Sequence, residues 1–276
     1  MGTFGLSIKV KVGGSWVSSI PSVKVSGAWT KVKKAYAKVA GTWQTTYEYE
    51  SVYTFSVDTH TDVDLDALGL DKYHNVRVVI PSGAVLVAST TSTYALKTGV
   101  GYSGKLTIEN NGKILGRGGR GGHGGASSSS YPRLSGKTGT DGGVAIHIEA
   151  AVTIDNNSTL SGGGSGGGGT GGVSYYAGLS NAYVGGNGGG GGVPYGTKGI
   201  GGTGTNSTGR YGTDATLTAI GIGGGTTSPI AGNGGAVGSA GIAGEAPPNG
   251  NYGSSGAAGA AGATYYNPSN FTVTQI

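Results

Sequence analysis

The sequence has no cysteine, little charge and few prolines. None of its 276 residues is Cys, so folding needs no disulfide and is compatible with a reducing cytoplasm. Only 11% of the residues are charged and 16 are tyrosine, which argues against ordinary disorder, because disordered chains are typically highly charged and poor in aromatic residues. The 8 prolines are too few for a collagen-like helix.

Long apolar runs are also missing. No apolar stretch reaches the roughly 18 residues of a membrane-spanning helix, and the first residues, MGTFGLSIKV, contain no signal-peptide core. We therefore expect no membrane insertion. The net charge of +5 raises the question of nucleic acid, but lysines concentrate between residues 9 and 38, where they alternate with valine. This alternation favours a solvated strand face over a phosphate-binding groove, so no nucleic-acid partner is predicted.

Glycine is abundant, with 62 residues, and much of it follows a three-residue period. The clearest example is 116–125, GRGGRGGHGG, and similar runs occur at 162–172, 185–192, 199–204, 221–225, 232–235 and 256–262. A period of three fits neither an α-helix nor a pleated strand, but it fits the extended helix of the polyproline II type. The alternative for such a composition is a flexible Gly/Ser linker.

A repeat argues against the linker. Residues 106–116, LTIENNGKILG, match residues 152–162, VTIDNNSTLSG, position by position at a separation of 46. Each copy reads as a strand, a turn containing Asn and an apolar residue that leads into a glycine run. Extended three-fold helices must pair their backbone groups with neighbouring helices, and such close neighbours leave no room for Cβ atoms. The predicted fold is therefore an all-β N-terminal part plus a polyglycine II helix sandwich, with little or no α-helix.

The N-terminal region contains three short repeats, each with a tryptophan: Trp16, Trp29 and Trp43. Each repeat reads as a strand, a turn with glycine and a second strand that begins near the Trp. Residues 1–46 are interpreted as a module that docks on another protein through these tryptophans, with a self-contained β-meander as the alternative. Residues 47–115 are predicted to form a β-strand domain and residues 116–276 the glycine sandwich.

The connections between glycine runs alternate in length. Long ones span 126–141, 173–184, 205–216 and 245–255, and short ones span 193–198, 226–231 and 264–268. If each run crosses the bundle once, the long connections gather at one end, and the short ones gather at the other with the turns 110–112 and 156–158. The long connections are rich in Tyr, Ser and Asn, a composition shared with antibody paratopes. The candidate receptor-binding residues are Tyr131, Arg133, Tyr175, Tyr176, Tyr183, Arg210, Tyr211, Asn249 and Tyr252. The alternative is that these tyrosines only cover the bundle.

No catalytic or metal site is predicted. The acids beyond residue 116 are scattered, and His147 with Glu149 lacks a nucleophile motif. The glycine runs lack the lysine of a phosphate-binding loop. The acidic stretch 58–71 has no EF-hand spacing and is interpreted as a surface loop, while His60 and His74 are interpreted as structural or exposed. We expect neither an enzyme nor a cofactor.

The motifs IPSGAVLVAS, TYALKTG, LTIENNGKILG and GRGGRGGHGG, within residues 76–125, resemble those of glycine-rich adhesins at the tips of bacteriophage tail fibres. The resemblance covers roughly residues 50–276. It implies a polyglycine II sandwich whose distal loops contact outer-membrane proteins or surface glycans of Gram-negative hosts. It also implies a virion protein, made in the host cytoplasm, that joins a tail-fibre or tail-tip protein through its N-terminal part. That part differs from the attachment domain of T-even-type adhesins, since its Trp repeats resemble short modules of phage tail proteins.

Two other functions are compatible with these features. Some ice- or surface-binding proteins use the same glycine period, although they favour flat faces and short loops. A purely structural component of the virion tail is the second alternative.

Overall fold

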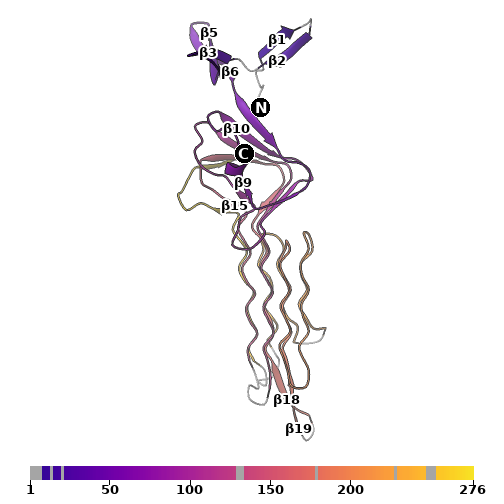
Figure 1. The fold of residues 1–276 in the computed structure, drawn as a ribbon. Helices are drawn as coiled ribbons and strands as arrows, with labels where there is room; N and C mark the ends of the chain where they lie inside the picture. Colours follow the sequence, from indigo (N-terminus) through magenta and orange to yellow (C-terminus); the bar gives the residue numbers. More distant parts are fainter. Residues whose placement is uncertain are drawn as a thin grey trace.

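The computed structural model describes residues 8–12, 15–19, 22–128, 134–177, 180–226, 229–246 and 253–276. The molecule is elongated, with short hairpins at the N-terminal end, a block of β-sheets next to them and a long bundle of extended segments beyond (Figure 1). Within the described residues, the one helical element is a short 3-10 helix, η1 (Leu65–Leu68), and no helix is long and apolar enough to cross a membrane. The predicted all-β class is confirmed.

Each tryptophan repeat forms an antiparallel hairpin. The pairs are β1 (Ile8–Val12) with β2 (Ser15–Ser19), β3 (Ser22–Val25) with β4 (Ala28–Lys31), and β5 (Lys34–Val39) with β6 (Thr42–Glu48). The turns at 26–27 and 40–41 have positive φ at both central residues, as a two-residue hairpin turn requires. Among the described strands each hairpin is a separate two-stranded sheet, so the three do not join into one meander.

The following strands form three parallel sheets. In chain order the strands are β7 (Glu50–Thr54), β8 (Thr59–Thr61), β9 (Val63–Asp64), β10 (Asn75–Ile80), β11 (Val85–Val87), β12 (Leu96–Lys97), β13 (Leu106–Asn110), β14 (Lys113–Leu115), β15 (Ile146–His147), β16 (Val152–Asn156), β17 (Thr159–Ser161), β20 (Tyr265–Tyr266) and β21 (Val273–Gln275). The sheets run β21-β16-β13-β10-β7, β17-β14-β11-β8 and β20-β15-β12-β9. Each turn of the chain adds one strand to each sheet, which is the arrangement of a three-sided parallel β-helix.

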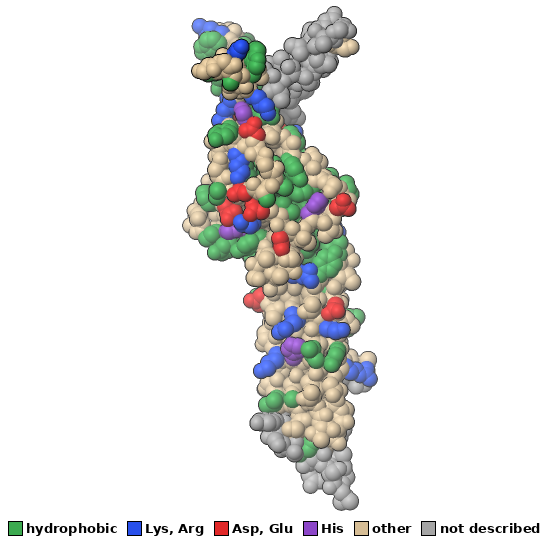
Figure 2. Space-filling model, in the orientation of Figure 1, with side chains coloured by type: hydrophobic (Ala, Val, Ile, Leu, Met, Phe, Trp, Pro, Cys, Tyr) green, Lys and Arg blue, Asp and Glu red, His purple; other side chains and the backbone are tan. Residues whose placement is uncertain are grey.

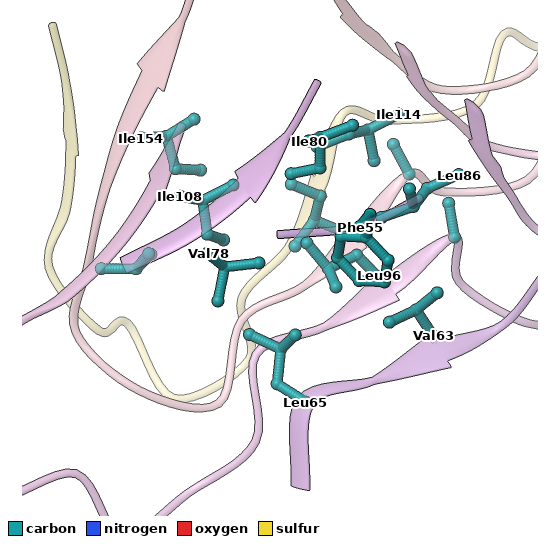
Figure 3. Packing of buried hydrophobic residues seen from close by; sticks show 14 of the residues in the cluster. Phe55, Val63, Leu65, Val78, Ile80, Leu86, Leu96, Ile108, Ile114 and Ile154 are labelled. Atoms are coloured by element: carbon teal, nitrogen blue, oxygen red, sulfur yellow. The ribbon is translucent and has the colours of Figure 1, made fainter. Parts of the chain in front are cut away.

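The repeat of 46 residues is one turn of this β-helix. Leu106 pairs with Val152, and Ile108 with Ile154, in register between β13 and β16. Because side chains alternate along a strand, the same apolar positions of successive turns stack inside the β-helix. Val78, Ile108 and Ile154 form such a row, and all three are fully buried (Figure 3). The core therefore lies between the three sheets.

The β-helix is discontinuous in the sequence, which corrects the predicted boundary at residue 115. Strands β15, β16 and β17 lie between residues 146 and 161, and β20 and β21 lie between residues 265 and 275. The glycine segments leave the β-helix after β14 and again after β17, and the chain returns each time to the third sheet. The sandwich is thus a double insertion at one corner of the β-helix. A contiguous 47–115 domain would lack Ile146 and Ile154 of the core.

The bundle is held together by backbone hydrogen bonds that recur every third residue. Along 116–128, the N–H groups of Gly119, Gly122 and Gly125 donate to 162–172 at 2.8 to 2.9 Å. The N–H groups of Gly118, Gly121 and Gly124 donate to residues between 194 and 200 at 2.7 to 2.9 Å. Consecutive residues therefore face different neighbours, as in a three-fold extended helix. The predicted polyglycine II sandwich is confirmed, and the flexible-linker alternative is not.

The hydrogen bonds arrange the segments in three layers. One outer layer holds 134–143, 116–128 and 196–204; the middle layer holds 253–263, 162–172, 185–192 and 208–216; the other outer layer holds 240–246, 229–235 and 220–225. Segment 162–172 bonds to six others: 116–128, 134–143, 253–263, 240–246, 229–235 and 185–192. Neighbours on every side leave no outward position, which explains why 162–172 is glycine at all positions except Ser165 and Thr170.

Glycine content follows the number of neighbours. Segment 116–128, with neighbours on four sides, has glycine at two of three positions in GRGGRGGHGG, and Arg117, Arg120 and His123 occupy the third. Segments at the edges of the layers, such as 208–216 and 253–263, touch fewer neighbours and keep glycine at about every third position. This corrects two predicted connections. Residues 126–128 and 134–141 of the connection 126–141, and 208–216 of the connection 205–216, belong to bundle segments.

Apolar side chains fix the bundle to the β-helix. Three turns at the near end each contribute one residue, Tyr195, Leu217 or Val237, and these pack on a cluster formed by Val85, Val87 and Leu115. The opposite end of the bundle carries the hairpin of β18 (Val173–Ala177) and β19 (Ser180–Val184), far from the N-terminal hairpins (Figure 1). The bundle therefore has a direction, and the hairpin marks its distal end.

Candidate functional site at the distal end

The distal hairpin carries three of the predicted receptor-binding tyrosines. Tyr175 and Tyr176 lie on β18 and Tyr183 on β19, and the strands pair from Val173 with Val184 to Ala177 with Ser180. The Tyr183 N–H donates to the Asn206 side chain at 2.6 Å, and the Asn206 N–H donates to the Tyr183 carbonyl at 2.9 Å. The base of the hairpin is thus bonded to the turn that follows 196–204, which gives the hairpin a defined position.

The residues Tyr131, Arg133, Asn249 and Tyr252 lie outside the described part of the chain. The structure does describe Leu134 and Gly253, which are close to them in the sequence. The Gly172 N–H donates to the Leu134 carbonyl, and the Gly253 N–H donates to the Gly172 carbonyl, both at 2.9 Å. Leu134 and Gly253 therefore lie beside the first residues of the distal hairpin.

Arg210 and Tyr211 lie on the side of the bundle and not in a loop. The sequence placed them in a long connection, but the N–H groups of Gly209 and Gly212 donate to Gly202 and Gly199 at 2.9 and 3.1 Å, as in a bundle segment. Because 208–216 lies at the edge of the middle layer, Arg210 and Tyr211 are exposed, Tyr211 to 54%. The space-filling view shows Lys and Arg side chains scattered along the bundle, whose surface is otherwise mostly backbone and small polar groups (Figure 2).

Next to the hairpin base, a cavity of about 230 Å³ opens between bundle segments. Its lining includes Val173, Val184, Asn187, Arg210 and Thr226. Sequence reasoning identified Arg210 but not Asn187 or Thr226. The available signal was Asn187 itself, which interrupts the otherwise uniform glycine run 185–192.

The histidine considered for catalysis is part of an aromatic stack. The His147 ring lies 4.7 Å from Tyr94 and 5.0 Å from Tyr266, measured between ring centroids. Its Nδ1 is 3.5 Å from Glu149 Oε1, too long for a strong hydrogen bond. Glu149 also faces Lys97 at 3.8 Å, and Lys97 pairs with Asp64 at 3.1 Å. These groups form a ladder across the third sheet, in which Lys97 pairs in register with Asp64 and His147.

The acidic stretch 58–71 makes contacts within the protein. Burial opposes ionisation of Asp62, but hydrogen bonds from Ser89 and Thr93 outweigh it and lower the pKa of the carboxyl group. Asp66 pairs with Lys72, and Asp71 lies 3.1 Å from His74. The described residues contain no group of three or more His, Cys, Asp or Glu side chains that could hold a metal ion. The stretch thus organises the surface of the β-helix.

At the other end of the molecule, each hairpin pairs its Trp with a lysine across the strands: Lys11 with Trp16, Lys24 with Trp29 and Lys38 with Trp43. Trp29 is 74% exposed and Trp43 68% exposed. Strands β3 and β4 are exposed at every position. Two-stranded hairpins are at best marginally stable alone in water, so this surface lacks the packing that such strands need.

The comparisons with known proteins agree with this architecture. The family model described as "Phage tail fibre adhesin Gp38" matches residues 50–276, which is most of the chain. The chain belongs to this family. No curated protein sequence matches it. Among solved structures, it is similar to a chain of the crystal structure of the gp37-gp38 adhesin tip complex of the bacteriophage S16 long tail fiber. The TM-score is 0.53 at 26% identity, over 83% of this chain and 79% of that one.

The adhesin is a component of the phage tail fibre, in the virion. The match begins at residue 50, immediately after the hairpins β1 to β6, and includes the whole β-helix and sandwich. The three hairpins with their tryptophans therefore precede the family region.

Proposed function

We propose that the adhesin attaches the phage to its host by binding an outer-membrane protein through the distal end of the bundle. The main support for this proposal is the tyrosine hairpin β18–β19. It lies at the end opposite the N-terminal hairpins, and hydrogen bonds at its base fix its position. Tyrosine offers a large amphipathic contact at a low cost in conformational entropy. Tyr131, Arg133, Asn249 and Tyr252 are assigned to the same surface. The adhesin acts by binding, without catalysis and without a cofactor.

The test is a competition for host cells. Purified adhesin, added before the phage, is expected to reduce adsorption in proportion to the number of receptors it occupies. Host strains that each lack one outer-membrane protein identify the receptor, since one of them should bind neither the adhesin nor the phage. Adhesin that neither binds susceptible cells nor blocks infection would contradict the proposal and indicate a purely structural component.

The N-terminal hairpins are proposed to hold a tail-fibre protein. The similar S16 structure is a complex of gp37 with gp38, which supports a fibre partner here. In this chain the exposed indoles of Trp29 and Trp43, with Trp16 in the equivalent position, are assigned to that contact. Buried tryptophans are frequent hot spots of protein interfaces, and a partner would supply the packing that isolated hairpins need.

Trp29→Ala and Trp43→Ala are each expected to weaken binding to the fibre partner more than tenfold, because a hot-spot side chain contributes about 2 kcal/mol or more. The melting temperature of the β-helix and bundle should not change, since both indoles are exposed. Pull-down of the fibre protein and a thermal melt measure the two effects. Val100→Ala, at a side chain 55% exposed on the β-helix, is the control. Equal loss of binding in the control would contradict the assignment.

A further inference from the structure

The cavity beside the hairpin base exists because the bundle segments differ in length. Segments 196–204 and 208–216 are joined near Ser207, at the level where the Gly185 N–H donates to the Ser207 carbonyl at 2.9 Å. Segments 220–225 and 229–235 end earlier, near Asn187, whose side-chain amide donates to the Pro229 carbonyl at 2.9 Å. Within the part of the chain that the structure describes, the shorter pair leaves one side of the central segment 185–192 without a neighbour at its distal end. This gap is the cavity.

Asn187 makes the floor of the cavity rigid. Its side-chain oxygen accepts from the Arg210 N–H at 2.8 Å, and its own N–H donates to the Thr170 hydroxyl at 2.8 Å. With the bond to Pro229, one side chain and its backbone link four segments of the bundle: 162–172, 185–192, 208–216 and 229–235. A site of fixed shape reduces the ordering cost of binding a ligand.

Arg210 gives the cavity a positive charge. Its guanidinium Nη1 donates to the hydroxyl of Thr226, another lining residue, at 3.2 Å, and this bond holds the group at the cavity. None of the described lining residues is acidic, and none of the ion pairs found among the described residues includes Arg210. A guanidinium carries five N–H donors in a planar fork that matches a carboxylate. The charge and the N–H donors of Arg210 thus suit the cavity to binding an anion.

The remaining lining matches a sugar ring. Ser207 and Thr208 add hydroxyl groups, while Val173, Val184 and Pro229 add apolar surface. Sugar rings likewise combine polar edges with apolar C–H faces. The volume of about 230 Å³ lies below the roughly 300–1,000 Å³ typical of sites for drug-sized ligands, so it suits one ring and not an oligosaccharide.

We propose that this cavity binds a single carboxylate-bearing sugar unit of the bacterial surface glycan, with Arg210 on the carboxylate. The inference rests on the proposed function, since it adds a glycan contact beside the surface assigned to the outer-membrane protein. Arg210 then acts in recognition from the side of the bundle. Thr226 is a positioning residue that orients the guanidinium.

The test measures binding of free sugars to the whole adhesin by ligand-observed NMR. D-glucuronate and D-galacturonate are the probes, with D-glucose and D-galactose as neutral counterparts and acetate as the bare carboxylate. We expect at least one acid to bind, at least tenfold more tightly than its neutral counterpart and than acetate. Failure of both acids to bind overturns the proposal. Equal binding of the neutral sugar overturns the role of charge, and equal binding of acetate reduces the cavity to an adventitious anion site only.

Substitutions test which residues form the proposed sugar site. Arg210→Ala should weaken binding of the acid at least tenfold and Thr226→Val less, whereas Arg120→Ala on the outer layer should change nothing. The bond from the Arg210 N–H to Asn187 involves the backbone, so Arg210→Ala should keep the melting temperature of the parent. Unchanged acid binding in Arg210→Ala contradicts the proposal. Adhesin that binds no sugar but still blocks adsorption refutes the glycan site alone, and leaves the proposed receptor function standing.

Discussion

Gly121→Ala is expected to destabilise the bundle by on the order of 3 kcal/mol, with a fall in melting temperature of roughly 10 °C. A Cβ atom built on Gly121 overlaps the carbonyl group of Gly189 in the adjacent central segment. To make room, the two segments must separate, which strains the bond from the Gly189 N–H to the Gly122 carbonyl at 2.8 Å and that from the Gly121 N–H to the Thr197 carbonyl at 2.8 Å. Thermal unfolding followed by circular dichroism measures the change.

The matched control is the preceding residue. Arg120 occupies the outward position of the same three-residue period and is exposed, so Arg120→Ala should alter the stability by no more than about 0.5 kcal/mol. The contrast between neighbouring positions distinguishes a packed polyglycine helix from a loose glycine-rich chain. Equal melting temperatures for both variants would contradict the packing described for 116–128.

Removal of the distal hairpin is expected to reduce adsorption to host cells by at least a hundredfold. Val173 and Val184 are paired directly, so an Asn-Gly turn can replace 174–183 and still join the two bundle segments. This change removes Tyr175, Tyr176 and Tyr183 together and leaves the hydrogen bonds of the glycine segments in place. Binding of labelled adhesin to susceptible cells gives the loss, and the melt shows whether the bundle is intact.

Ile242→Ser provides the control for this experiment. Ile242 is 59% exposed on 240–246, an edge segment of the bundle that does not line the cavity. Loss of a single exposed apolar side chain there should leave cell binding unchanged. If the shortened adhesin binds cells as well as the parent does, recognition lies elsewhere on the protein.

Much of the fold could be predicted from local patterns in the sequence. The three Trp repeats predicted three hairpins, because turn residues that favour positive φ and alternating strands act within a few residues. The period of three in GRGGRGGHGG predicted polyglycine II packing, because both the hydrogen bonds and the exclusion of Cβ repeat with it. The repeat at a separation of 46 residues predicted two equivalent strands, and in the structure these strands pair, Leu106 with Val152.

Features of the fold that depend on contacts between residues distant in the sequence could not be predicted from these local patterns. Segments 134–143 and 208–216 carry glycine at about every third position and read as loops, because edge segments exclude Cβ atoms on fewer sides. The return of the chain to the β-helix after each insertion depends on pairing between residues as distant as Ile146 and Tyr265. For the same reason Arg210 was placed in a loop, and the contribution of Asn187 to the cavity was missed.

We propose that the bundle is a scaffold and that its distal end determines the host. Host specificity can be measured on a chimera in which residues 129–133, 174–183 and 247–252, the segments proposed to bind the host, are exchanged for those of a family member with a different host. The host specificity is expected to follow the exchanged segments, with the melting temperature of the parent bundle retained. A correctly folded chimera that keeps the original host specificity would contradict it.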